Sequence, residues 1–85
     1  MSPDFTIDKI AYKNAANYID LMPENINIGA SDKGNVFMKL NEKVLIFDSH
    51  NYVAFADMKK NVCSYVRCSD HMEIVRLIAE EFHLK

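Results

Sequence analysis

The strongest constraint on the fold is a change of hydrophobic period along the chain. From residue 25 to residue 68 the apolar side chains recur at nearly every second position, in short runs separated by turn-forming residues. On both sides of this region they recur every three to four residues, which is the spacing of a helix. A period of two is typical of strands, because successive side chains of a strand point to opposite faces. The pattern therefore predicts a sheet between two helices.

The central region divides into four or five predicted strands. Each is a short run rich in β-branched or aromatic residues, and it ends where Asn, Asp, Ser or Gly residues gather. The predicted strands cover residues 25–28, 36–40, 44–47, 52–56 and 62–68. Because the links between them are short, neighbouring strands are expected to pair antiparallel, as a meander.

The N-terminal helix is predicted from apolar residues that share one helical face. They are Ile7, Ala11, Ala15, Tyr18 and Met22. Two starts are compatible with helix-capping chemistry, one at Ser2-Pro3-Asp4 and one at Thr6 followed by Asp8. Pro23 ends the helix, because proline disfavours helical backbone in the residue before it.

The C-terminal helix is predicted to start at Asp70, which has Glu73 at the spacing of a capping box. Its apolar face comprises Ile74, Leu77, Ile78 and Phe82. The 85 residues suffice for one domain, residues 1–85, and a hydrophobic fraction of 49% is ordinary for a globular chain. The predicted fold class is α+β in two layers, with an N-terminal helix, an antiparallel meander of four to five strands and a C-terminal helix packed on the sheet.

The middle strands are apolar on both faces. Val44 and Ile46 point to one face of the sheet, while Leu45 and Phe47 point to the other. Two helices on one side would leave the second face uncovered, and an uncovered antiparallel face is normally polar. Either a terminal helix wraps round the sheet, or the strands are simply central, or a second copy or a partner protein covers the face. The last reading predicts a homodimer or a protein partner.

Charge is uneven along the chain. Residues 35–68 carry four Lys and Arg67 against three acidic residues, whereas the segments on either side are acidic. Cations and aromatic rings alternate here, as on sheets that bind single-stranded nucleic acid or RNA. The candidate nucleic-acid or partner contacts are Lys39, Lys43, Lys59, Lys60, Arg67, Phe37, Tyr52 and Tyr65. The competing interpretation is that these lysines guard turns and strand edges.

Two cysteines, Cys63 and Cys68, lie five residues apart in one predicted strand, so their side chains point to opposite faces. We expect two free, mostly buried thiols and therefore a reducing, cytoplasmic location. With His71 they have the order C-x4-C-x2-H, but a structural zinc site needs four ligands, so no metal is predicted. No apolar run is long enough to span a membrane, and Met1 to Asp4 do not resemble a secretory leader.

No catalytic constellation is predicted. Asp48-Ser49-His50 contains the residue types of a hydrolase triad, but adjacent residues do not give the geometry of a triad, and the run is typical of a turn. Cys63 and His71 match no motif of a thiol nucleophile and its base. The chain has two glycines and no glycine-rich phosphate loop, so no cofactor is expected.

The sequence thus favours a small non-enzymatic protein that docks on another macromolecule, as an inhibitor, an antitoxin-like factor or a regulatory factor, and it predicts that the chain forms a homodimer. Eight Lys, eight Asn and eight Ile are typical of AT-rich coding sequences, such as those of many phages. The alternative is an RNA or single-stranded nucleic-acid binder that uses the basic, aromatic sheet region. A third hypothesis is a small enzyme whose site is completed between two subunits.

Overall fold

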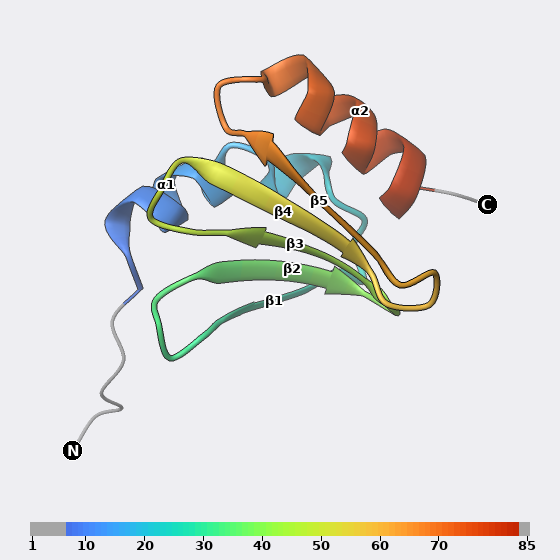
Figure 1. Cartoon of the computed structure of the whole chain (residues 1–85), viewed down its shortest axis with the longest axis horizontal. Coiled ribbons are helices and arrows are strands. Elements are labelled where there is room, and N and C mark those ends of the chain that lie inside the picture. The colour runs from blue at the N-terminus through green and yellow to red at the C-terminus, as the bar shows by residue number, and fades with distance from the viewer. Residues whose placement is uncertain (1–6, 84–85) are drawn as a thin grey trace.

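The computed structural model describes residues 7–83 and shows one five-stranded sheet with its helices on one side (Figure 1). The start at Ser2-Pro3-Asp4 and Thr6 of the second start lie outside the described residues. The elements, in chain order, are α1 Lys9–Ala16, the 3-10 helix η1 Ile19–Leu21, β1 Asn27–Ala30, β2 Val36–Leu40, β3 Lys43–Phe47, β4 Tyr52–Asp57, β5 Val62–Arg67 and α2 His71–Phe82. The α+β prediction is confirmed.

The sheet is an antiparallel meander in the strand order β1-β2-β3-β4-β5. Three of its turns contain an asparagine with a positive φ angle. Asn41, Asn51 and Asn61 have φ values of 56°, 61° and 59°, in the left-handed region that asparagine tolerates better than most residues. Gly34 occupies the same region, at φ 87°, in the turn between β1 and β2. Three hairpin links therefore each place one asparagine where a β-branched residue would be strained.

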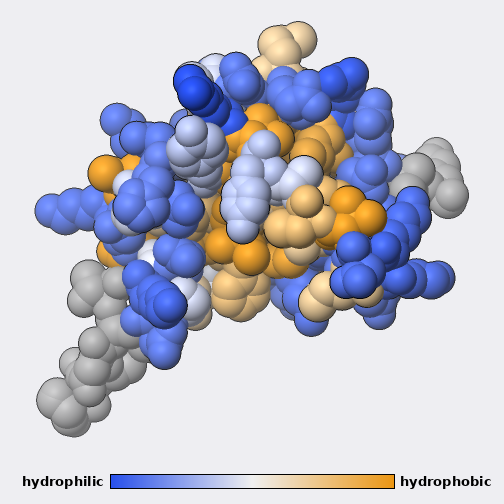
Figure 2. Space-filling view, in the orientation of Figure 1, coloured by the Kyte–Doolittle hydropathy of each residue, from blue (hydrophilic) through white to orange (hydrophobic). Residues whose placement is uncertain are grey.

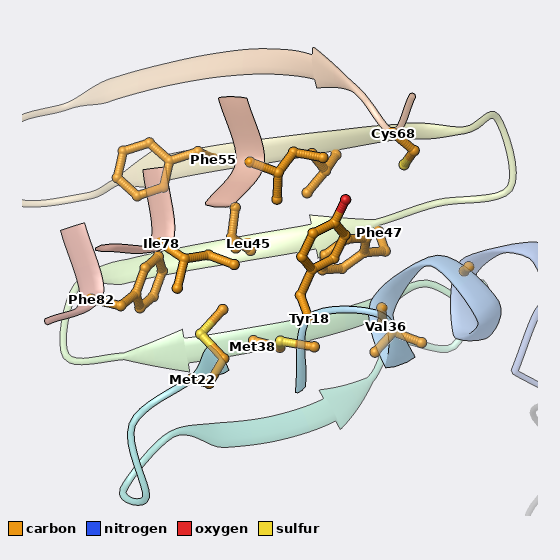
Figure 3. Packing of buried hydrophobic residues seen from close by; sticks show 14 residues of the cluster. Tyr18, Met22, Val36, Met38, Leu45, Phe47, Phe55, Cys68, Ile78 and Phe82 are labelled. Carbon is orange, nitrogen blue, oxygen red and sulfur yellow. The ribbon is translucent and has the colours of Figure 1, made fainter. Parts of the chain in front are cut away.

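The core lies between the helices and one face of the sheet (Figure 3). Its largest fully buried side chains are Phe47, Met38, Leu45, Ile74, Ile78 and Val53. Tyr18 stacks on Phe47 with ring centroids 5.9 Å apart, and Phe55 meets Phe82 edge to face. Ala11 and Ala15 of α1 belong to the same cluster as the core residues of α2, so both helices cover the same face.

The N-terminal helix is shorter than predicted. Asp8 is its cap, and the Asp8 carboxylate accepts hydrogen bonds from the backbone N–H groups of Ile10 and Ala11. The backbone N–H groups of Asn17 and Tyr18 then bond carbonyls three residues back, which tightens and ends α1. The prediction of one helix up to Met22 was therefore wrong, although Tyr18 and Met22 are buried in the core as their spacing indicated.

At the start of α2, the predicted capping box is not formed. Asp70 is the N-cap residue, but its side chain makes no capping hydrogen bond. Glu73 instead forms an ion pair with Arg76, one turn further along the helix. The helix is held by its apolar face, in which Ile74, Ile78 and Phe82 are buried.

Candidate functional site

The sheet has one face that no described residue of the helices covers, and we call it the open face. The register places its side chains in cross-strand rows. The open face comprises Asn27, Gly29, Phe37, Lys39, Val44, Ile46, Tyr52, Ala54, Ala56, Cys63, Tyr65 and Arg67. Val44 is buried, yet it lies outside the core cluster, which confirms that the sheet has a second apolar side.

The middle of the open face is apolar. One row runs from Gly29 through Phe37, Ile46 and Ala54 to Tyr65. The Phe37 ring lies over Gly29: a Cβ at Gly29 would be 2.5 Å from the ring carbon Cζ of Phe37, so a larger residue there would have to displace the ring. Figure 2 shows hydrophobic side chains gathered across the middle of the molecule and bordered by hydrophilic ones.

The charges of the sheet separate between its two faces. Asp57 is the one carboxylate within the five strands, and it is buried on the helix side, where it accepts hydrogen bonds from the backbone N–H groups of Lys59 and Lys60. Lys39 and Arg67 are the cations of the open face. The strands therefore present a face with an apolar centre, two positive charges and no negative charge.

The candidate contact residues divide into two groups. Phe37, Lys39, Tyr52, Tyr65 and Arg67 meet on the open face, as a common sheet surface requires.

The other three candidates lie elsewhere. Lys43 points to the helix side, where its ammonium group is 3.0 Å from the Glu81 carboxylate and donates to the Glu81 carbonyl oxygen. Lys59 and Lys60 lie in the turn after β4. The sequence places Lys43 among the candidate cations, but only the packing of α2 shows that Lys43 is paired with Glu81.

A second cluster of polar groups lies at the end of the sheet near α1. The Tyr18 hydroxyl and His71 Nδ1 are hydrogen-bonded at 2.6 Å, and the Asn14 amide donates to the Asn51 side-chain oxygen at 3.0 Å. An open cavity here is lined in part by Asn17, His50 and Arg67. Asparagine is a poor helix former, and the hydrogen bond to Asn51 gives Asn14 a structural role in α1.

Two groups at this end of the sheet have raised pKa values. Burial raises the pKa of the Cys68 thiol, and the nearby Asp48 carboxylate raises it further, so the thiol is kept protonated. Burial likewise raises the pKa of the Tyr18 hydroxyl. In the Asp48-Ser49-His50 run, the Asp48 carboxylate accepts from the backbone N–H of His50, which is a turn and not a triad contact.

The cysteines lie on opposite faces, as predicted, but they are not both buried. Cys68 is in the core, whereas Cys63 is exposed on the open face, because β5 is an edge strand with no neighbour beyond it. Within residues 7–83 no group of three or more His, Cys, Asp or Glu side chains is placed to hold a metal ion. None of the helices in this part of the chain has the length and apolar character to cross a membrane.

We expect the two thiols to react at very different rates. In the folded protein a maleimide reagent should modify Cys63 quickly and Cys68 at least roughly tenfold more slowly, because Cys68 reacts only after local opening. Intact-mass measurement over time, with Cys63→Ser and Cys68→Ser variants as references, gives both rates. Equal rates would show that the end of the sheet around Cys68 is open.

Comparison of the chain with protein families, with curated proteins and with solved structures gave no match. The candidate function therefore rests on the geometry of the open face.

Proposed function

We propose that this chain is a non-enzymatic binding protein that docks on another protein through the open face of its sheet. The observation that carries the proposal is the pairing of an apolar, aromatic sheet face with two helices that both pack on the other side. Large apolar patches on a monomer typically mark interaction surfaces. Such a protein would act as an inhibitor, an antitoxin-like factor or a regulatory factor, by covering a surface of its partner.

The charge of the open face indicates the chemistry of the partner. Lys39 and Arg67 flank the apolar rows, and the strands supply no carboxylate to balance them. A complementary surface has an apolar centre with acidic residues at its rim. A second copy of this chain would oppose like charges instead, so we assign the face to a different protein. Both thiols are free, which fits a reducing compartment, and we place the protein in the cytoplasm.

Nucleic acid fits the face less well than protein does. Phe37, Tyr52 and Tyr65 could stack on bases. However, only two of the five candidate cations lie on the open face. Each phosphate contact contributes about 0.7 to the salt dependence of single-strand binding, so two contacts give a slope near −1.4 and weak attraction.

The test places a photo-crosslinking amino acid at Tyr65 on the open face or at Tyr12 on α1. The two tyrosines are a matched pair, 69% and 60% exposed. We expect the Tyr65 position, and not the Tyr12 position, to yield one discrete protein adduct in cells of the source organism. After the partner is identified and purified, Ala54→Arg should lower its affinity about tenfold or more, because the change puts a charge in the apolar row.

The control for that substitution is Ile10→Arg, on the exposed side of α1, which should leave the affinity unchanged. Adducts that disappear with nuclease would favour the nucleic-acid alternative, and an adduct of twice the chain mass would favour the homodimer. The same adducts from Tyr12 and Tyr65 would contradict docking at the open face.

A further inference from the structure

Strand β5 forms an edge of the sheet, and its outward backbone groups can be identified from two hydrogen bonds. Cys68 donates its N–H to the Asn51 carbonyl at 2.8 Å, immediately after the β4–β5 register ends. Met58 donates to the Glu42 carbonyl at 2.9 Å, immediately after the β3–β4 register ends.

Hydrogen-bonded and non-hydrogen-bonded pairs alternate along an antiparallel ladder. Counting from either bond therefore identifies the same residues of β5 as directing their backbone groups to β4. Val62, Ser64 and Val66 direct their backbone groups to β4, while Cys63, Tyr65 and Arg67 direct theirs outward. The Arg67 carbonyl accepts from the N–H of Asp70. Within residues 7–83 the outward N–H groups of all three residues and the carbonyls of Cys63 and Tyr65 have no backbone partner, and they can bond another chain.

This edge lacks the features that normally block a further strand. Its first five residues, Val62 to Val66, contain no charge and no proline, and the β4–β5 register has no bulge. β1, at the opposite edge, is only four residues long. In Figure 1, β5 is the edge strand that lies beside α2.

A shallow groove follows the helix side of this edge. Strand residues Val62 and Ser64 line it together with α2 residues Glu73, Arg76, Leu77 and Glu80. Glu73, Arg76 and Glu80 form a stripe along α2, and Asp70 and Glu73 line the continuation of the groove past Tyr65. The acidic residues outnumber Arg76 along the groove.

We propose that β5 accepts an extended segment of a partner protein as a sixth strand, and that this segment alternates basic and apolar side chains. In an added antiparallel strand, one set of side chains would point toward the α2 stripe, where lysine or arginine would pair with Glu80 and share Glu73 with Arg76. The alternate set would extend the open face beyond Tyr65, where apolar side chains fit. Backbone bonds to β5 supply affinity, and the two side-chain sets supply selectivity.

A second copy of the chain fits this edge less well. Two-fold pairing of β5 with itself would bring two α2 stripes together, each with two glutamates and one arginine. The acidic excess thus favours a basic partner segment. The inference does not depend on docking at the open face, because the strand edge and the groove are a separate surface.

The test uses a capped synthetic decapeptide that alternates Lys and Val, with a Glu-Val decapeptide of the same design as the control. Binding to the full chain is followed by the backbone amide signals of β5 and α2. We expect the Lys-Val peptide to shift and protect the amides of Cys63, Tyr65 and Arg67, and the Glu-Val peptide to leave them unchanged. Added salt should weaken the binding, because the groove contacts are ionic.

Two kinds of variant separate the backbone and charge contributions. Tyr65→Pro removes an outward N–H, a change that edge strands accommodate, and should lower the affinity tenfold or more, whereas Tyr65→Ala keeps the N–H and should retain binding. The double variant Glu73→Gln and Glu80→Gln removes the charges of the groove and leaves the backbone of β5 intact. It should weaken binding of the Lys-Val peptide severalfold, and it tests the inference even if the proline variant does not fold.

Three results would overturn the inference. They are the absence of any β5 shift at millimolar Lys-Val peptide, equal binding of both peptides, and unchanged binding by a folded Tyr65→Pro variant. Shifts confined to Phe37, Ile46 and Ala54 would place the peptide on the open face. That outcome would also refute addition at the β5 edge, while leaving the proposed docking face standing.

Discussion

Replacing Phe47 by alanine is expected to lower the free energy of unfolding by about 3–5 kcal/mol. Phe47 is fully buried at the end of the central strand β3, and its ring stacks on Tyr18. Removing the ring leaves a cavity that the sheet backbone cannot collapse to fill, and also removes the packing that fixes the chain after α1. In a domain of this size the loss is a large share of the total stability. Urea unfolding followed by circular dichroism measures it.

The matched control is Phe37→Ala, on the open face of the neighbouring strand β2. Phe37 pairs with Ile46, next to Phe47 in β3, but its ring is only half-buried. We expect its loss to be roughly 1–2 kcal/mol, because less apolar area leaves water when this ring folds into place. An equal loss at both positions would mean that the open face is packed as tightly as the core.

Replacing Phe82 by alanine is expected to cost a similar amount, about 3–5 kcal/mol. Phe82 is the last residue of α2, it is 3% exposed, and its ring meets Phe55 at a centroid distance of 6.1 Å and an angle of 77°. The substitution removes an aromatic contact that holds the end of α2 on the sheet, so the last turn should also exchange its amide hydrogens faster. Thermal unfolding and hydrogen exchange measure the two effects.

Val75→Ala is the control within the same helix. Val75 is 38% exposed and outside the buried face of α2, so its loss should stay below about 1 kcal/mol. If Phe82→Ala left the unfolding curve unchanged, the final turn of α2 would contribute nothing to the fold. The ion pair of Lys43 with Glu81 would then be a surface contact without consequence for stability.

The sequence predicted the order of the elements because the hydrophobic period is a local property. The alternation in residues 36–40 and 52–56 indicated strands, and the spacing of Ile74, Ile78 and Phe82 indicated the buried face of α2. The prediction failed at the end of α1, where the 3-10 bonds of Asn17 and Tyr18 follow from the packing of Tyr18 on Phe47 and His71. The apolar residues keep helical spacing up to Met22, so the hydrophobic period could not show that α1 ends at Ala16.

The candidate site was predictable in part. The interleaving of cations with aromatic residues indicated four surface candidates that share the open face in the structure: Phe37, Lys39, Tyr65 and Arg67. The engagement of Lys43 by Glu81 depends on two residues that are 38 positions apart, and no local pattern encodes it.

The amino-acid sequence by itself determined that the middle strands have two apolar faces. Val44 and Leu45 are adjacent apolar residues, and a period of two places them on opposite faces. Only the tertiary structure decided that Leu45 enters the core while Val44 belongs to the open face. The physical reason is that both faces of the sheet are apolar enough to accept a helix. Which face is covered depends on residues from both ends of the chain, because Ala11, Ile74 and Phe82 pack together against the same face.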